Sequence, residues 1–74
     1  MINYAYIIKK LRTKLILSQT EFAYLLGTTF GTVNRWESGK HEPTIKMKRK
    51  IVQLCVENDV KLEDEWYVYK SIKN

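Results

Sequence analysis

The sequence predicts a small all-α domain, a bundle of four or five helices, and three observations lead to this fold class. The 74 residues suit one domain with a modest core, and their 45% hydrophobic fraction is typical of a globular chain rather than a disordered basic tail. Apolar residues recur at helical spacing in successive segments. Side chains that cap helix N-termini precede these segments, at Asn3, Ser18, Thr29 and Thr44.

The first two helices follow from amphipathic spacing and from a capping pattern. A first helix over residues 3–16 places apolar side chains on one face: Tyr4, Ile7, Ile8, Leu11 and Leu15. Ser18 and Glu21 have the spacing of a capping box, in which each side chain accepts a hydrogen bond from the other residue's backbone N–H. The buried face of this second helix is expected to be Phe22, Ala23, Leu25 and Leu26, and Gly27 ends it in the left-handed conformation.

Two further helices follow short turns. The third is expected from Phe30 to Ser38, before Gly39, and the fourth from the Thr44 cap to about Glu57. The inner stripe of the fourth helix is predicted to be Met47, Ile51, Leu54 and Cys55. Residues 58–74 carry no decisive pattern, because Val60 and Leu62 fit either a short fifth helix or a packed turn, and residues 66–69 fit a strand or one helical turn.

Charge is unevenly distributed along the chain. Residues 1–56 hold ten Lys or Arg against three Asp or Glu, and residues 57–74 hold three against five, so the net charges are +7 and −2. Positive charge on the body favours a polyanionic partner, chiefly nucleic acid or an anionic membrane surface. A solubilising surface charge explains the composition alone equally well.

Composition also excludes several classes of protein. Cys55 is the single cysteine, and one Cys with one His cannot build a zinc site, so we expect no disulfide, metal or cofactor. The apolar runs are only a few residues long, and the N-terminus lacks the pattern of a secretory signal. No nucleophile–base pair or phosphate-binding loop is visible. We therefore expect a cytoplasmic domain that is not an enzyme and does not bind a membrane.

Residues 19–38 form two helices joined by a tight Gly-containing turn, which defines a helix-turn-helix by pattern. The strings LSQTEFAYLLG (17–27) and TVNRWESGKHEP (32–43) resemble the Cro/C1-type (XRE) family of phage and bacterial regulators, with its lambda repressor-like DNA-binding domain. The resemblance covers residues 4–56. It implies that the helix over 30–38 enters the major groove of DNA while the preceding helix crosses the backbone. The fourth helix departs from the family, since Lys48, Arg49 and Lys50 stand where many members place leucines.

Geometry divides the third helix into two faces. Val33, Trp36 and Glu37 share one face and should pack on the body, whereas the other presents Phe30, Gly31, Asn34, Arg35 and Ser38. We predict base contacts by Asn34 to an adenine edge and by Arg35 to a guanine edge or a phosphate. Phe30 would contact a thymine methyl group, and Gly31 would allow a close approach of the helix. The alternatives are a solvated Asn34 and a Phe30 partly folded back onto Tyr24 or Leu26.

Phosphate contacts form a separate class, because they position a protein on DNA without specifying a sequence. The resemblance implies that Gln19, at the start of the second helix, holds a phosphate. Further phosphate contacts are predicted for Thr29, Thr32, Ser38 and Lys40. The resemblance also implies a largely buried ion pair between Arg12 and Glu37, which would link the first helix to the third and keep Arg12 away from DNA.

The leading hypothesis is a sequence-specific transcriptional regulator, a repressor, whose residues 1–57 bind double-stranded DNA. It would act as a homodimer on an inverted-repeat operator. Residues 58–74 would form a tail for dimerisation or for a protein partner, because this segment holds more apolar surface than a four-helix body can cover: Trp66, Tyr67, Val68, Tyr69 and Ile72. The alternative is an antitoxin-like interaction module that neutralises a partner protein and binds DNA for autoregulation.

Overall fold

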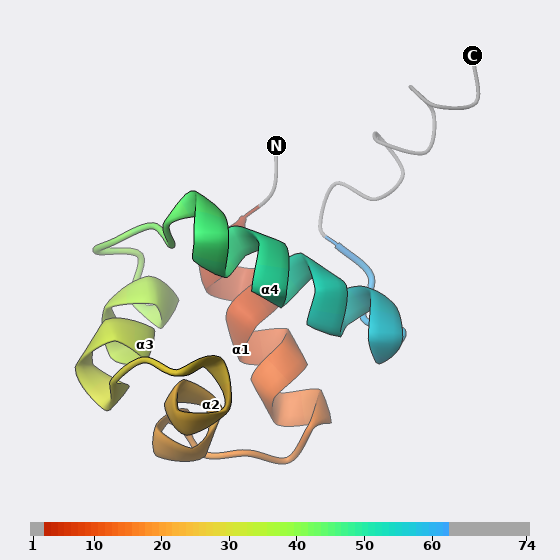
Figure 1. Cartoon of the computed structure of the whole chain (residues 1–74), viewed down its shortest axis with the longest axis horizontal. Coiled ribbons are helices and arrows are strands. Elements are labelled where there is room, and N and C mark those ends of the chain that lie inside the picture. Colours follow the sequence, from red (N-terminus) through yellow and green to blue (C-terminus); the bar gives the residue numbers. More distant parts are fainter. Residues whose placement is uncertain (1–2, 63–74) are drawn as a thin grey trace.

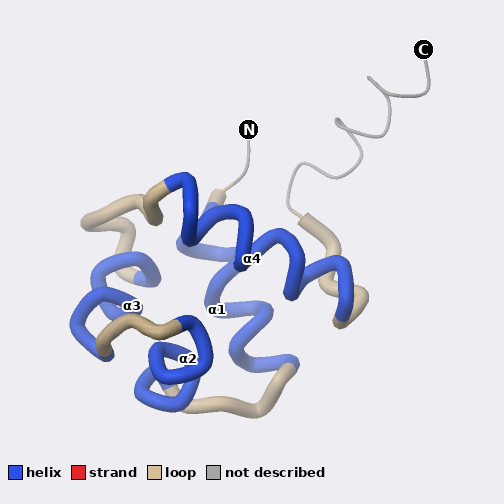
Figure 2. The backbone as a smooth tube through the Cα atoms, viewed as in Figure 1, coloured by secondary structure: helices blue, strands red, loops and turns tan. Residues whose placement is uncertain are grey.

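Residues 3–62, which the computed structural model describes, form four helices and no strand (Figures 1 and 2). The helices are α1 (Tyr4–Lys14), α2 (Gln19–Leu26), α3 (Phe30–Glu37) and α4 (Ile45–Glu57). The predicted all-α bundle with a helix-turn-helix is therefore confirmed. None of the helices described is long and apolar enough to cross a membrane.

Each helix begins at a predicted cap. Ser18 and Glu21 form a complete capping box, since the Glu21 N–H donates to Ser18 Oγ at 3.1 Å and the Ser18 N–H donates to Glu21 Oε1 at 2.8 Å. The side chains of Asn3, Thr29 and Thr44 each accept a hydrogen bond from the backbone N–H three residues on. Each bond satisfies an N–H group that has no partner inside its helix.

The four helices end in the same kind of left-handed turn, at Ile16, Gly27, Gly39 and Asp59. The N–H of the following residue in each case donates to the carbonyl five residues earlier, as in a Schellman motif. The two glycines were predicted to end α2 and α3. The prediction that the first helix runs to residue 16 was wrong, because Ile16 turns left-handed (φ 58°) and α1 stops at Lys14.

One apolar stripe from each helix builds the core. The buried residues are Ile7, Ile8 and Leu11 of α1, Phe22, Ala23 and Leu26 of α2, Val33 and Trp36 of α3, Ile51 and Cys55 of α4, and Val60. Met47 and Leu54 pack against this core but are only partly buried. Leu25 was predicted to be buried and is 52% exposed, because it lies about 100° around α2 from Leu26.

The arrangement leaves one side of α3 free of other helices. α3 packs against α2 and α1, and α4 lies across α1 (Figure 1). After α4 the chain forms a packed turn that buries Val60, so no fifth helix occurs within residues 3–62. The roles predicted for residues 66–72 lie outside the described residues.

Candidate nucleic-acid interface

α3 is divided between the core and the solvent as its spacing predicts. Val33 and Trp36 are buried, at 0% and 4% exposure, whereas Asn34 and Arg35 are exposed. Phe30, at the first position of the helix, is 51% exposed. An exposed phenyl ring, amide and guanidinium therefore lie on one short helix beside its buried face.

Gly31 lies between these side chains, and nothing in the described structure requires a glycine there. A Cβ atom built at this position would meet Arg35 Nη1 at 3.8 Å, an ordinary van der Waals contact. Glycine is one of the poorest residues for a helix interior. The structure therefore supplies no internal reason for Gly31.

Four of the five predicted phosphate ligands lie near the two ends of α3, and the fifth, Gln19, is the first residue of α2. Thr29 Oγ1 accepts a hydrogen bond from the Thr32 N–H at 3.3 Å, and the two threonine hydroxyls share a hydrogen bond of 3.0 Å. The Ser38 hydroxyl donates to the Arg35 carbonyl at 3.2 Å, and Lys40 is exposed in the turn that follows. Thr32 and Arg35 also line a hollow of about 340 Å³ beside the connection from α3 to α4.

Behind this surface, Arg12 of α1 meets Glu37 at the end of α3 in a two-point contact. Arg12 Nε donates to Glu37 Oε2 at 2.6 Å and Nη2 donates to Oε1 at 3.1 Å. Arg12 Nη1 also donates to the Leu17 carbonyl at 3.0 Å, which fastens the connection to α2. The side chains are only 17% and 7% exposed. The guanidinium is therefore occupied within the protein.

The ion pair alters the acidity of both partners. Burial removes water from the Glu37 carboxylate and by itself would raise its pKa. The hydrogen bonds from Arg12 and Gln19, together with the charges of Arg12 and Lys9, outweigh this effect, so the pKa of Glu37 is lowered from its ordinary value. The hydrogen bond to Glu37 raises the pKa of Arg12. The pair thus stays ionised near neutral pH.

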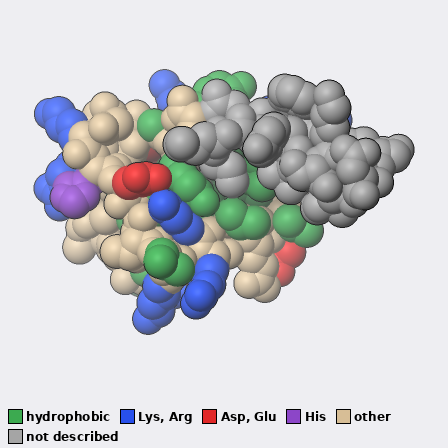
Figure 3. Space-filling view, turned by 90° about the horizontal axis from the view of Figure 1, so that it is seen from above, with side chains coloured by type: hydrophobic (Ala, Val, Ile, Leu, Met, Phe, Trp, Pro, Cys, Tyr) green, Lys and Arg blue, Asp and Glu red, His purple; other side chains and the backbone are tan. Residues whose placement is uncertain are grey.

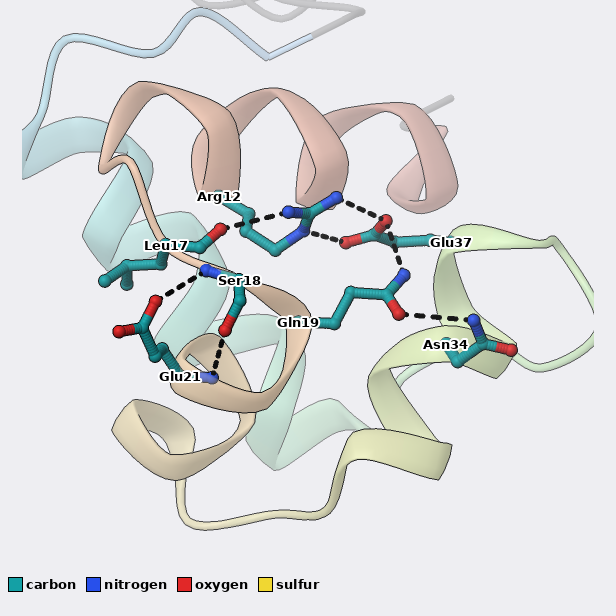
Figure 4. A network of polar contacts seen from close by, with 7 residues as sticks. All are labelled: Arg12, Leu17, Ser18, Gln19, Glu21, Asn34 and Glu37. Atoms are coloured by element: carbon teal, nitrogen blue, oxygen red, sulfur yellow. Dashed lines mark hydrogen bonds and ion pairs between the residues drawn. The ribbon is translucent and has the colours of Figure 1, made fainter.

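The ion pair continues through Gln19 to the exposed face of α3 (Figure 4). Gln19 Nε2 donates to Glu37 Oε1 at 3.0 Å, and Asn34 Nδ2 donates to Gln19 Oε1 at 3.2 Å. Sequence reasoning missed this connection, since it placed Asn34 and Glu37 on opposite faces. Their spacing of three residues, which makes them neighbours on a helix, was the available signal.

Basic side chains are spread over the described part of the face drawn in Figure 3, where acidic side chains show in few places. Two lysines of α4 are engaged within the protein. Lys48 pairs with Glu42 at 3.0 Å and lies over the Tyr4 ring, and Lys50 Nζ approaches the Leu26 carbonyl at 3.4 Å. Lys48 and Lys50 are therefore less available to a ligand than a lysine without such contacts.

Comparison with known proteins gives one match, to the model of the Cro/C1-type helix-turn-helix (XRE) family over residues 8–55 of the 74. The chain belongs to this family. No curated protein and no solved structure matches the chain. The matched region runs from α1 through most of α4, so it includes the helix-turn-helix of α2 and α3 and both partners of the Arg12–Glu37 contact.

As a member of the Cro/C1-type family, the protein is a DNA-binding helix-turn-helix regulator. The family consists of regulators that are generally not enzymes. Within residues 3–62 the structure shows no group of three His, Cys, Asp or Glu side chains that could hold a metal ion. The chemistry available to this Cro/C1-type protein at α3 is hydrogen bonding, charge and apolar contact.

Proposed function

We propose that the protein is a sequence-specific repressor that reads the major groove of double-stranded DNA with α3. The observation that carries this proposal is the composition of the exposed side of α3, where Asn34, Arg35 and Phe30 project beside a glycine while Val33 and Trp36 anchor the helix. A protein that occupies DNA excludes other proteins from the same site, and this occupancy needs no catalytic step. The compartment that suits this role is the cytoplasm of a bacterial cell.

Three side chains of α3 would read base edges. The Asn34 amide can pair with adenine, and the Arg35 guanidinium can form a two-point contact with guanine O6 and N7. The half-exposed Phe30 ring suits the methyl group of thymine. Gly31 would let the backbone of α3 approach the floor of the groove. This role supplies the reason for glycine that the described structure itself does not.

Phosphate contacts would hold α3 in register. Thr29 and Thr32 lie at the N-terminus of α3, and Ser38 and Lys40 lie at its other end. Gln19, the first residue of α2, keeps one Nε2 proton after its bond to Glu37 and can donate it to a phosphate oxygen. These five residues flank the three that would read bases, so they would fix the position of α3 along the duplex.

Replacing Gly31 with alanine should change stability and DNA affinity in opposite directions. Alanine favours the helix by about 1 kcal/mol over glycine, and the structure has room for its methyl group. Thermal unfolding should therefore occur at a higher temperature. Binding to the selected operator should weaken, because the methyl group holds α3 away from the groove floor. Unchanged operator affinity in the stabilised variant would show that Gly31 does not approach DNA.

A homodimer on an inverted repeat is the proposed assembly, with half-sites about one helical turn apart. Residues 58–74 are proposed to mediate it, because five apolar side chains are concentrated within residues 66–72 of this segment. Removing residues 63–74 should convert a dimer to a monomer in analytical ultracentrifugation at micromolar concentration. This truncation leaves the buried Val60 in place. An unchanged mass after truncation would assign the dimer interface to another part of the chain.

Selection of bound sequences from a random DNA pool tests the proposed function most directly. Enrichment of a recurring inverted repeat would support the proposed repressor. A pool in which no sequence is enriched would contradict this proposal. The antitoxin-like alternative predicts that the protein binds a separate partner protein and that removal of residues 63–74 abolishes that binding. Measuring DNA and partner binding on the same truncated protein separates the two functions.

A further inference from the structure

We propose that Gln19 is a positioning residue for DNA recognition. Its hydrogen bond to the Glu37 carboxylate fixes the orientation of its own amide, which in turn fixes the orientation of the Asn34 amide, so that Asn34 selects adenine over guanine. This inference rests on the proposed function and deepens it, since it names the base and the residue that enforces the choice. It starts from the chain of contacts between the buried ion pair and the exposed side of α3 (Figure 4).

The direction of each hydrogen bond follows from the charge at the buried end. The Glu37 carboxylate is paired with Arg12 and, being ionised, only accepts hydrogen bonds. Gln19 must therefore turn Nε2 toward it, which leaves Gln19 Oε1 on the opposite side of the amide. Oε1 also only accepts, so Asn34 must present Nδ2 to it. One buried negative charge thus sets the orientation of both amides, although either amide alone could flip.

The consequence is a defined pair of groups at the exposed end. Asn34 gives one Nδ2 proton to Gln19 and keeps the other, and its Oδ1 points away from Gln19 (Figure 4). Adenine presents an N6 amino donor beside the N7 acceptor in the major groove, which complements Oδ1 and the remaining proton. Guanine presents acceptors at both O6 and N7 and repels Oδ1. A freely rotating amide could turn its NH₂ group toward guanine, so the bond to Gln19 excludes that alternative.

The free protein gives the first test. Gln19→Met keeps the side-chain length and removes both polar atoms, and Gln53→Met is the matched control, because Gln53 donates to Glu57 at 3.2 Å on the exposed side of α4. In NMR spectra, the Asn34 Nδ2 proton that donates to Gln19 should exchange with water more slowly in the wild type than in Gln19→Met, because the hydrogen bond protects it. Gln53→Met should exchange as the wild type does. Equal exchange of this proton in the wild type and in Gln19→Met overturns the inference.

The second test measures base discrimination. Asn34→Ala first identifies the base pair at which sequence preference is lost. Discrimination is then the ratio of the affinity for the selected operator to the affinity for the same site with adenine replaced by guanine at that pair. The wild type should discriminate by about 5- to 150-fold, the range of a two-point amide contact. Gln19→Met should lose about fivefold or more of this ratio, and Gln53→Met should lose none. In the Asn34→Ala background, Gln19→Met should change the ratio by less than about twofold, because Gln19 acts through Asn34.

The outcomes separate this inference from the proposed function. If Gln19→Met lowers the affinity for all sequences equally and leaves the discrimination ratio intact, Gln19 only contacts phosphate and the inference is overturned. If the wild type binds DNA without any sequence preference, the proposed function fails and the adenine assignment fails with it. If Gln19→Met loses its preference at the base pair read by Asn34 and keeps it at every other base pair, the result supports both the inference and the proposed function.

Discussion

Replacing Glu37 with alanine should lower the free energy of unfolding by up to about 3–5 kcal/mol, because Arg12 would keep a part-buried charge without its partner. Small domains are stable by only about 5–15 kcal/mol, so this loss is a large fraction of the total. The variant should begin to unfold at moderate temperature. The substitution also removes the hydrogen bond from Gln19 to Glu37. The Arg12 guanidinium, no longer held by Glu37, should in addition lose its hydrogen bond to the Leu17 carbonyl.

Thermal and urea unfolding followed by circular dichroism would measure this loss. Glu42→Ala is the matched control, because Glu42 pairs with Lys48 at 3.0 Å while its side chain is 68% exposed. Exposed pairs contribute about 1 kcal/mol or less, so the control should unfold close to the wild type. A Glu37→Ala variant as stable as Glu42→Ala would show that the buried pair does not stabilise the fold.

Acid provides a second measurement of the same pair. The pKa of Glu37 is lower in the folded protein than in the unfolded chain, so its contribution to stability is complete above the unfolded pKa and is lost as the pH falls through the folded one. The wild type should therefore lose stability below about pH 4.5, the ordinary pKa of a glutamate. Glu37→Gln should lack this part of the acid dependence. An equal acid dependence in Glu37→Gln would assign it to other carboxylates.

DNA affinity should fall steeply and linearly with salt on logarithmic axes, since each neutralised phosphate releases counterions. A dimer that neutralises about six phosphates should lose roughly 10³-fold in affinity between 50 and 200 mM salt. Lys40→Ala removes one exposed charge beside α3 in each protomer of the proposed dimer and should weaken operator and random DNA alike. The slope should become shallower by about one for each protomer.

Asn34→Ala is the matched comparison for Lys40→Ala. It should cost about 1–3 kcal/mol on the operator, relax the preference at one base pair and leave the salt slope unchanged. Fluorescence anisotropy with labelled operator and random duplexes at several salt concentrations measures all of these quantities. A parallel loss on both duplexes for both variants would mean that Asn34 does not read bases. If the wild type shows no salt-sensitive DNA binding, the proposed repressor function is wrong and the antitoxin-like interaction module is favoured instead.

The helix starts were open to prediction from the sequence because the physics behind them is local. A capping side chain reaches a backbone N–H only three residues away, so Ser18 and Thr29 act in their helices whatever surrounds them. Gly27 and Gly39 ended their helices as predicted, since glycine enters the left-handed region without strain. The two buried residues of α3, Val33 and Trp36, follow from helical spacing alone.

Tertiary structure decided the features that join residues from different helices. No local preference predicts a left-handed Ile16, a β-branched residue that is strained there. The Arg12 guanidinium, which binds Glu37 of α3, also donates to the Leu17 carbonyl directly after this turn. The sequence alone indicated that Gln19 and Asn34 are polar and accessible, but not that they would bond to each other. Their side chains meet because α2 and α3 pack together, and the charge of Glu37, held by Arg12 from α1, then sets the direction of their hydrogen bond.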